Sequence, residues 1–293
     1  MSKRIKNSRA VVLYLPGNVE QFKMFRMFLN SVEMINAVDT DVLVFYQPRY
    51  ESILNHYQGM KLGSNDAELR LIPLERPSSF DPALKGYHYV DSLACIIGQD
   101  WLYEYEYILR TDTDTLLTPK WNTAYPHKFT TGKGAYNTCD EIKDKLNIVS
   151  QRNRLFQGPF YQYNPGSTWY GKSKEVIEAA TLTVAVTRDL LLNEFKNNEG
   201  TWPGFYRGVA LLYASELSIN HLIPDFIIDA DNFDFHSTSA NPITNHTHIH
   251  CWHTDNDKVF SKHAFFAGAY EHTSIEDLDT NIIRDYCLYC AIA

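Results

Sequence analysis

Two carboxylates one residue apart are the sharpest chemical feature of this 293-residue sequence. Asp112 and Asp114 stand in the string Arg-Thr-Asp-Thr-Asp-Thr, directly after the apolar run at 105–110. Because alternate residues of an extended segment point the same way, both carboxylates can converge on one hard divalent cation. Mg²⁺ and Mn²⁺ commonly bind through one or two carboxylates together with substrate phosphates. We therefore predict a divalent metal site here; the alternative is a solvated acidic turn.

A group of histidines near the C-terminus offers further metal ligands. His246, His248, His250 and His253 lie close together in the sequence. In a strand, the first three would face one side, and His253 would face the other side with Cys251. Imidazole suits Mn²⁺ or Zn²⁺ better than Mg²⁺, so at least one of these histidines is a candidate ligand. A packed structural histidine and a self-contained zinc site are the alternatives.

The elements that must position these residues alternate along the first third of the chain. Apolar runs of strand length occur at 10–15, 41–46, 69–74 and 105–110, and helical patterns at 19–37, 50–58 and 88–100. Strands that alternate with helices predict an α/β fold with a mostly parallel central sheet flanked by helices. Ligands bind such sheets beyond the carboxyl ends of the strands, which is where Asp112 and Asp114 stand.

The second half of the chain is less regular. The patterns predict a glycine-bearing loop at 131–134, helices near 140–151, 173–196 and 206–220, and strands near 168–170, 225–229 and 247–252. No repeat, low-complexity segment or linker interrupts the sequence. We therefore predict one domain over 1–293, with a nucleotide-binding half at about 8–135, an acceptor-binding half at about 136–270 and a C-terminal helix or tail at 271–293.

Composition limits the kinds of partner. The chain has 27 Lys and Arg against 35 Asp and Glu, a net charge of −8, and 44% hydrophobic residues, which excludes wholesale disorder. An acidic chain without a basic cluster argues against nucleic acid as a partner. No apolar stretch approaches the ~18 residues of a membrane span, and no apolar signal segment follows the basic start. We expect a cytoplasmic protein without a transmembrane segment; its oligomeric state stays open.

Three motifs, in fixed order, carry a resemblance to a known family. They are the strand ending in D-x-D at 108–114, the Asn-x-Gly turn at 163–168 and the string Ile-His-Cys-Trp-His at 249–253. Together they resemble the GT-A fold glycosyltransferases, nucleotide-sugar enzymes that include glycogenin and the bacterial lipopolysaccharide galactosyltransferases. The similarity in the order of elements covers about 10–265. The chain also looks like an uncharacterised group of algal, protist and large-virus proteins.

The resemblance implies a set of metal ligands. Asp114 would bind the metal directly, and Asp112 would bind the metal together with the ribose side of the nucleotide. His250 would complete the set, with His253 as the second choice. The implied cofactor is Mn²⁺ or Mg²⁺, and the implied donor is a nucleoside-diphosphate sugar, which we expect to be a UDP-sugar.

The resemblance also implies a lysine on the diphosphate. Lys258 and Lys262 are both candidates, because the spacing after the histidine differs from the family pattern and the family's usual glycine is missing. A nucleoside diphosphate leaves readily only when its developing charge is neutralised. A divalent cation does this as a Lewis acid, and a lysine adds a mobile positive charge. This pair would let an acidic protein hold a diphosphate.

The acceptor side has candidates of its own. Asn164 and Gly166 match a turn that borders the acceptor and the sugar in the family, although an ordinary Asn-Pro-Gly turn is the alternative. Trp202 offers an aromatic face to a sugar, or else anchors a core. Asn220 lies one helical turn after Glu216 on the same face, and its amide suits a sugar hydroxyl.

Glu216 and Asp255 are the candidate catalytic carboxylates. Retaining members of the family place a carboxylate or amide near the position of Glu216. An inverting enzyme would instead need a carboxylate base within hydrogen-bond reach of the acceptor hydroxyl. The Asn-x-Gly and Ile-His elements are most similar to retaining members, so retention is the expectation. A surface glutamate on an amphipathic helix is the alternative for Glu216.

The combined hypothesis is a metal-dependent glycosyltransferase that moves a hexosyl or pentosyl group from a nucleotide sugar to a glycan or other hydroxyl acceptor. A metal-dependent hydrolase or nucleotidyltransferase could use the same carboxylates, and a non-catalytic sugar- or nucleotide-binding relative is a third possibility. The missing secretory signal departs from the membrane-anchored Golgi members of the fold and points to a cytoplasmic or viral enzyme. The sequence gives neither the donor sugar, the acceptor nor the linkage.

Overall fold

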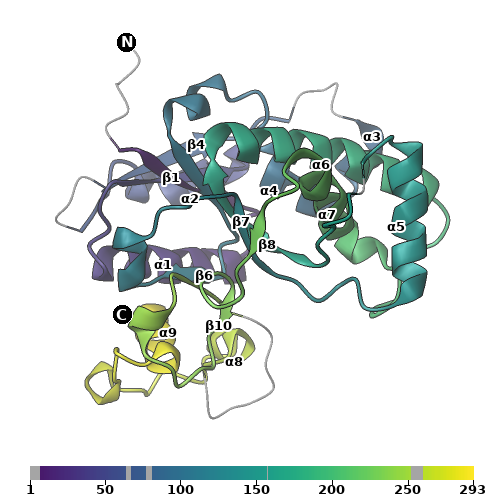
Figure 1. Ribbon diagram of the computed structural model, residues 1–293. Coiled ribbons are helices and arrows are strands. Elements are labelled where there is room, and N and C mark those ends of the chain that lie inside the picture. Colours follow the sequence, from purple (N-terminus) through teal and green to yellow (C-terminus); the bar gives the residue numbers. More distant parts are fainter. Residues whose placement is uncertain (1–6, 64–66, 77–80, 157, 252–259) are drawn as a thin grey trace. The chain divides into compact units, whose positions relative to one another are not determined.

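A computed structural model describes residues 7–63, 67–76, 81–156, 158–251 and 260–293 (Figure 1). It is an α/β structure with a mostly parallel sheet flanked by helices, as predicted. The chain divides into two compact units that interleave along the sequence. Unit 1 comprises Met1–Leu74, Leu109–Tyr125 and Asp229–Ala293, and unit 2 comprises Glu75–Ile108 and Pro126–Ile228. The prediction of a single domain with two sequential halves stays a prediction.

Unit 1 is built on parallel strands. β1 (Arg9–Leu15) pairs in parallel with β2 (Thr40–Tyr46), which pairs in parallel with β4 (Ala67–Pro73), and the short β3 (Lys61–Leu62) joins β4 antiparallel. Every residue of β1 and β2 is buried. Strands covered on both faces read as nearly continuous apolar runs, which is why the sequence reveals them.

Helices of unit 1 lie close to these strands. α1 (Val19–Met34) begins after Asn18, whose side chain accepts a hydrogen bond from the Gln21 backbone N–H and so caps the helix. The C-terminal helix α9 (Ile283–Ile292) packs against α1 (Figure 1). α2 (Glu51–Leu54) and α8 (Lys262–Phe266) are single-turn helices.

A second, smaller sheet in unit 1 joins distant parts of the chain. Its strands are β6 (Thr115–Leu117), β10 (Phe235–His236) and β11 (His248–His250), in the order β10-β11-β6. β11 runs antiparallel to β6, and the register places His250 opposite Thr115. Because β5 (Tyr107–Arg110) and the D-x-D segment directly precede β6, this pairing brings the late histidines beside the early aspartates.

Unit 2 combines three strands with longer helices. β7 (Thr130–Lys133) pairs antiparallel with β8 (Pro165–Lys172) and parallel with β9 (Ile227–Ile228). α6 (Ser173–Asn193) packs against α7 (Ala210–Leu222), and α7 also packs against β8. The remaining helices of unit 2 are α3 (Pro82–Lys85), α4 (Asp91–Ala94) and α5 (Asp140–Arg152).

The structure corrects some predicted elements. The segment 131–134, predicted as a loop, lies almost wholly in β7, because its backbone pairs with neighbouring strands on both sides. The helix predicted at 88–100 shortens to α4 and adjacent turns, and Gly98 in this segment has a φ of 75°, a left-handed conformation that a helix interior does not allow. Among the described residues, no helix is long and apolar enough to cross a membrane.

Candidate metal centre

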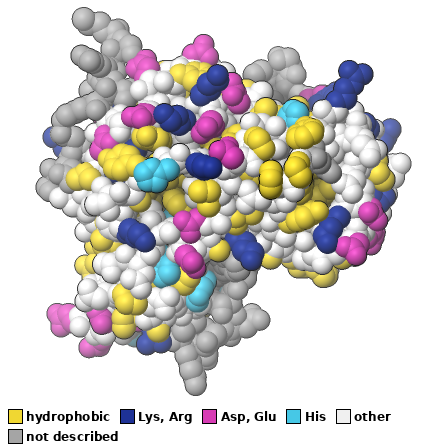
Figure 2. Space-filling view, in the orientation of Figure 1, with side chains coloured by type: hydrophobic (Ala, Val, Ile, Leu, Met, Phe, Trp, Pro, Cys, Tyr) yellow, Lys and Arg dark blue, Asp and Glu magenta, His cyan; other side chains and the backbone are white. Residues whose placement is uncertain are grey.

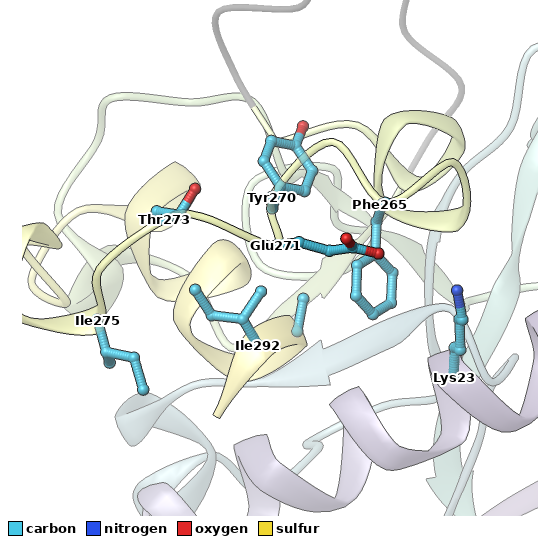
Figure 3. Close-up of a pocket in the computed structure, with 9 residues that line it drawn as sticks. Lys23, Phe265, Tyr270, Glu271, Thr273, Ile275 and Ile292 are labelled. Carbon is cyan, nitrogen blue, oxygen red and sulfur yellow. The ribbon is translucent and has the colours of Figure 1, made fainter.

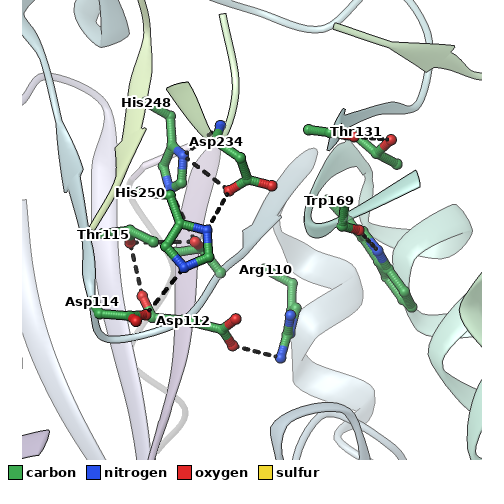
Figure 4. A network of polar contacts seen from close by, with 12 residues as sticks. Arg110, Asp112, Asp114, Thr115, Thr131, Trp169, Asp234, His248 and His250 are labelled. Atoms are coloured by element: carbon green, nitrogen blue, oxygen red, sulfur yellow. Dashed lines mark hydrogen bonds and ion pairs between the residues drawn. The ribbon is translucent and has the colours of Figure 1, made fainter. Parts of the chain in front are cut away.

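Three predicted ligands converge in unit 1. One ligand atom from each of Asp112, Asp114 and His250 lies within 4.8 Å of the other two, and all three side chains are partly exposed (Figure 4). The two aspartates lie in the loop between β5 and β6, and His250 ends β11 opposite the first residue of β6. Among the described parts of the chain, this is the only cluster of its kind. Two carboxylate oxygens and one imidazole nitrogen form a donor set that suits Mn²⁺.

Asp114 is the electrostatic centre of this cluster. Its Oδ1 lies 3.5 Å from His250 Nε2, and its Oδ2 lies 2.6 Å from Lys262 Nζ. Burial by itself raises the pKa of Asp114, but the positive charges of His250 and Lys262 outweigh burial and hold that pKa well below its usual range. Asp114 is therefore an anion that already attracts cationic groups.

Asp112 is the more exposed carboxylate, with 35% of its side chain accessible. Its Oδ1 accepts a hydrogen bond of 2.9 Å from Arg110 Nη2 on the buried end of β5. Its backbone carbonyl accepts a hydrogen bond from Thr115 Oγ1 at 2.7 Å, which fixes the turn between the two strands. The intervening Thr113 donates its hydroxyl to Gln21 of α1. These contacts present both carboxylates on one side of the loop.

His250 lies between two carboxylates. Its Nε2 faces Asp114, and its Nδ1 lies 3.4 Å from Asp234 Oδ1 (Figure 4). Burial by itself lowers the pKa of His250, but the two carboxylates raise that pKa well above its ordinary value. In the structure, His250 is thus set up as a cation between two anions.

The neighbouring histidines have structural contacts instead. His248 is fully buried, and its Nε2 lies 2.9 Å from Thr111 Oγ1. Burial lowers the pKa of His248 to about 4, so its ring is neutral at pH 7. His246 stacks on Phe235 with 3.5 Å between ring centroids. Of the predicted histidine ligands, the structure brings His250 to the aspartates, whereas His253 lies outside the described residues.

Of the two candidate lysines, only Lys262 lies among the described residues. Lys262 begins α8, directly after Ser261, whose side chain accepts from the Ala264 backbone N–H. It is 11% exposed and bonds Asp114, so the structure brings it into the cluster. Lys258 and the candidate catalytic residue Asp255 lie outside the described residues.

The predicted acceptor residues belong to unit 2, where Glu216 is the centre of a buried network. Its Oε1 accepts hydrogen bonds from Asn137 Nδ2 at 2.8 Å and from the Tyr161 hydroxyl at 3.0 Å, and its Oε2 accepts one from the Asn164 backbone N–H at 2.8 Å. Burial raises the pKa of Glu216, and these hydrogen bonds partly oppose that rise. The alternative of a surface glutamate is wrong, because Glu216 has no accessible surface.

The other acceptor candidates lie at different depths. The Asn164 side chain accepts hydrogen bonds from the backbone of Tyr136 and Asn137, and it holds a turn at a φ of 61°. Gly166 lies buried in β8, and Asn220 bonds both backbone groups of Gln162. Trp202 is 53% exposed, so its ring is accessible to a ligand and is not a core anchor.

Sequence reasoning missed three residues that shape these networks: Asp234 behind His250, Arg110 beside Asp112, and Asn137 beside Glu216. Asp234 belongs to no sequence motif, and only the pairing of β10 with β11 shows that it lies near the histidines. Arg110 adjoins the D-x-D string, and its two-residue spacing from Asp112 is the available signal, since alternate residues of a strand share a face.

A separate pocket of about 430 Å³ opens elsewhere in unit 1 (Figure 3). Its walls come from α1, from α8 and the segment after it, and from the end of α9: Lys23, Phe265, Gly268, Tyr270, Glu271, Thr273, Ile275, Ala291 and Ile292. None of the three candidate metal ligands lines this pocket.

On the face of the molecule shown in Figure 2, basic and acidic side chains are interspersed.

One family model matches almost the full length of the chain. A family model described as Domain of unknown function (DUF7164) matches residues 3–290. A search of curated proteins found no match.

Proposed function

Because the chain belongs to the DUF7164 family, whose description names no activity, we propose a function from the geometry of its candidate metal centre. The proposed function is that of a metal-dependent glycosyltransferase with a nucleoside-diphosphate sugar as donor and a hydroxyl group as acceptor. The observation that carries the proposal is the convergence of Asp112, Asp114 and His250.

The residues fit a divalent cation. Asp112 and Asp114 would supply carboxylate oxygens and His250 would supply Nε2, a mixed set that favours Mn²⁺ over Mg²⁺. Three protein ligands leave coordination positions for phosphate oxygens of a donor. When bound, the cation would supply Lewis-acid stabilisation of the departing diphosphate.

Lys262 adds a charge that can move. In the structure its ammonium group neutralises Asp114 at 2.6 Å. A divalent cation on Asp114 would compete with that ammonium, and a displaced Lys262 would lie beside the place where a diphosphate meets the metal. Lysine suits this task because its ammonium is a compact point charge on a flexible stem.

Arg110 would orient the second carboxylate. Its guanidinium is buried and bonds Asp112 Oδ1 at 2.9 Å, and so limits the rotation of this half-exposed carboxylate.

The assignment of Glu216 as a catalytic carboxylate stays a prediction, since both of its oxygens accept hydrogen bonds inside unit 2. Retention of the anomeric configuration, the UDP identity of the donor and the cytoplasmic location also stay predictions.

The test is release of nucleoside diphosphate by the purified full chain. A panel of UDP-, GDP- and ADP-sugars is incubated with Mn²⁺, with and without simple sugar acceptors, and with a chelator in parallel. We expect metal-dependent diphosphate release from at least one donor. Asp114→Asn should lose release and metal binding together, whereas Asp231→Asn removes the same charge from an exposed position and should retain both.

Several outcomes would decide against the proposal. Absence of any metal-dependent nucleotide binding or diphosphate release would overturn it. Release of pyrophosphate or a nucleoside monophosphate would indicate the nucleotidyltransferase or hydrolase alternative. Tight, metal-dependent nucleotide binding with no turnover for any donor would indicate a binding protein.

A further inference from the structure

Asp234 is a buried carboxylate placed directly behind a candidate metal ligand. Its side chain is 3% exposed, and its Oδ1 lies 3.4 Å from His250 Nδ1, on the side of the ring away from Asp114. The residue precedes β10 and has a φ of 54°, in the left-handed region that Asp and Asn tolerate better than most residues. From this position the carboxylate faces His250 at the end of β11.

The neighbouring His248 does not compete for this carboxylate as a donor. The Asp234 backbone N–H donates to His248 Nδ1 at 3.2 Å, so that nitrogen carries a lone pair and no proton. With Nδ1 accepting, the ring proton of His248 is on Nε2, which faces Thr111 Oγ1 at 2.9 Å. Because His248 Nδ1 has no proton to give, its approach of 3.6 Å to Asp234 Oδ1 is not a hydrogen bond. The Nδ1–H of His250 is therefore the ring N–H from which Asp234 Oδ1 can accept a hydrogen bond.

We propose that Asp234 is a positioning residue that holds the Nδ1–H of His250 and thereby aims Nε2 at the Asp112–Asp114 pair. A histidine fixed in this way offers its Nε2 lone pair to a cation in one orientation, and the carboxylate raises the basicity of the ligand nitrogen. The proposal rests on the metal centre of the proposed function. It extends that centre to a residue that neither the D-x-D string nor the histidine cluster contains.

The first experiment measures metal affinity in the full chain. Mn²⁺ binding is followed by titration calorimetry for wild type, Asp234→Asn and Asp231→Asn. Asparagine keeps the shape and tolerates the left-handed backbone, but it removes the charge that holds the imidazole N–H. We expect a loss of about 10- to 100-fold in Mn²⁺ affinity for Asp234→Asn. Asp231→Asn, an exposed change in the same loop, should bind like wild type.

The second experiment measures the protonation of the His250 ring nitrogens. Nitrogen-15 NMR of the metal-free protein, with His250→Gln to assign the signals, reports which ring nitrogen carries a proton. Wild type should show a slowly exchanging Nδ1–H for His250, and Asp234→Asn should show faster exchange of that proton. A role limited to folding would lower the melting temperature without changing the exchange of this one proton in the protein that remains folded.

The outcomes separate this proposal from the proposed function. If folded Asp234→Asn binds Mn²⁺ as tightly as wild type, the positioning role is overturned. If wild type binds no Mn²⁺ but its His250 Nδ1–H is protected by Asp234, the metal function fails and the hydrogen-bonded orientation stands. If wild type shows no protected Nδ1–H at His250, the positioning role fails whether or not metal binds.

Discussion

The two units each contain a buried or half-buried carboxylate with several partners, but the partners differ in kind. Asp114 in unit 1 faces the positive charges of His250 and Lys262, and its pKa is lowered. Glu216 in unit 2 faces a side-chain amide, a phenol and a backbone N–H, and its pKa is raised by burial. Cationic partners can be exchanged for a metal ion, whereas neutral donors fix one geometry. The first arrangement suits a binding centre, and the second suits a structural support.

The largest expected effect that separates the two carboxylates is on metal affinity. Asp114→Asn removes the most strongly anionic ligand, so we expect Mn²⁺ affinity to fall by roughly 100-fold or more. Glu216→Gln should leave Mn²⁺ affinity unchanged in protein that remains folded. Titration calorimetry on both variants measures this difference. Equal losses of Mn²⁺ affinity in the two variants would contradict the prediction.

The next effect is on the stability of the folded protein. Glu216→Gln replaces an acceptor oxygen by an NH₂ group that must face a donor, and we expect it to lower the free energy of unfolding by about 1–3 kcal/mol. Asp114→Asn should lower it as well, because His250 and Lys262 would lose the carboxylate that faces both of them. Urea unfolding of both variants gives the comparison. A more stable Glu216→Gln protein would show that the cost of burying the carboxylate exceeds the benefit of its hydrogen bonds.

The pH dependence of stability gives a finer test of the Glu216 network. Because burial raises the pKa of Glu216, the folded protein keeps this proton at pH values where the unfolded chain, with an ordinary pKa near 4.5, has lost it. The contribution of Glu216 to the free energy of unfolding should therefore fall as pH rises from 4.5 through the raised pKa. Tyr136, Tyr161, Asn137 and Asn164 face this group.

Subtracting the profile of Glu216→Gln from that of wild type isolates this contribution. A difference that rises with pH over the same window would mean that the four donors overcome burial and that the native carboxylate is ionised more readily than the unfolded one.

The smallest expected effect concerns Lys262. Lys262→Gln removes the ammonium group that competes for Asp114, so we expect Mn²⁺ affinity to rise by about five-fold, equivalent to about 1 kcal/mol. Affinity for UDP in the presence of Mn²⁺ should fall instead, because a positive charge near the diphosphate is lost. Weaker Mn²⁺ binding in Lys262→Gln would contradict the exchange of lysine for metal.

The sequence allows part of this centre to be predicted because the relevant physics is local. Asp112 and Asp114 are one residue apart at the end of a strand, and the structure brings them together in a turn, where the sequence pattern predicted an extended segment. Continuous apolar runs reveal β1 and β2. The choice of His250 from its neighbours depends on the register of β11 on β6, which no local pattern encodes. The role of Asp234 further requires a left-handed residue before β10. The strand β7 was not predicted because its sequence, Thr-Thr-Gly-Lys, contains no apolar run.

The antiparallel pairing of β6 with β11 has a thermodynamic consequence. It closes a loop that contains about half the chain, and loop closure costs the unfolded chain conformational entropy. An ion held by Asp114 and His250 would act as a reversible cross-link across this closure, and it would bind the folded form far better than the unfolded one. Metal availability would then set how much of the protein is folded, as well as whether its site is occupied.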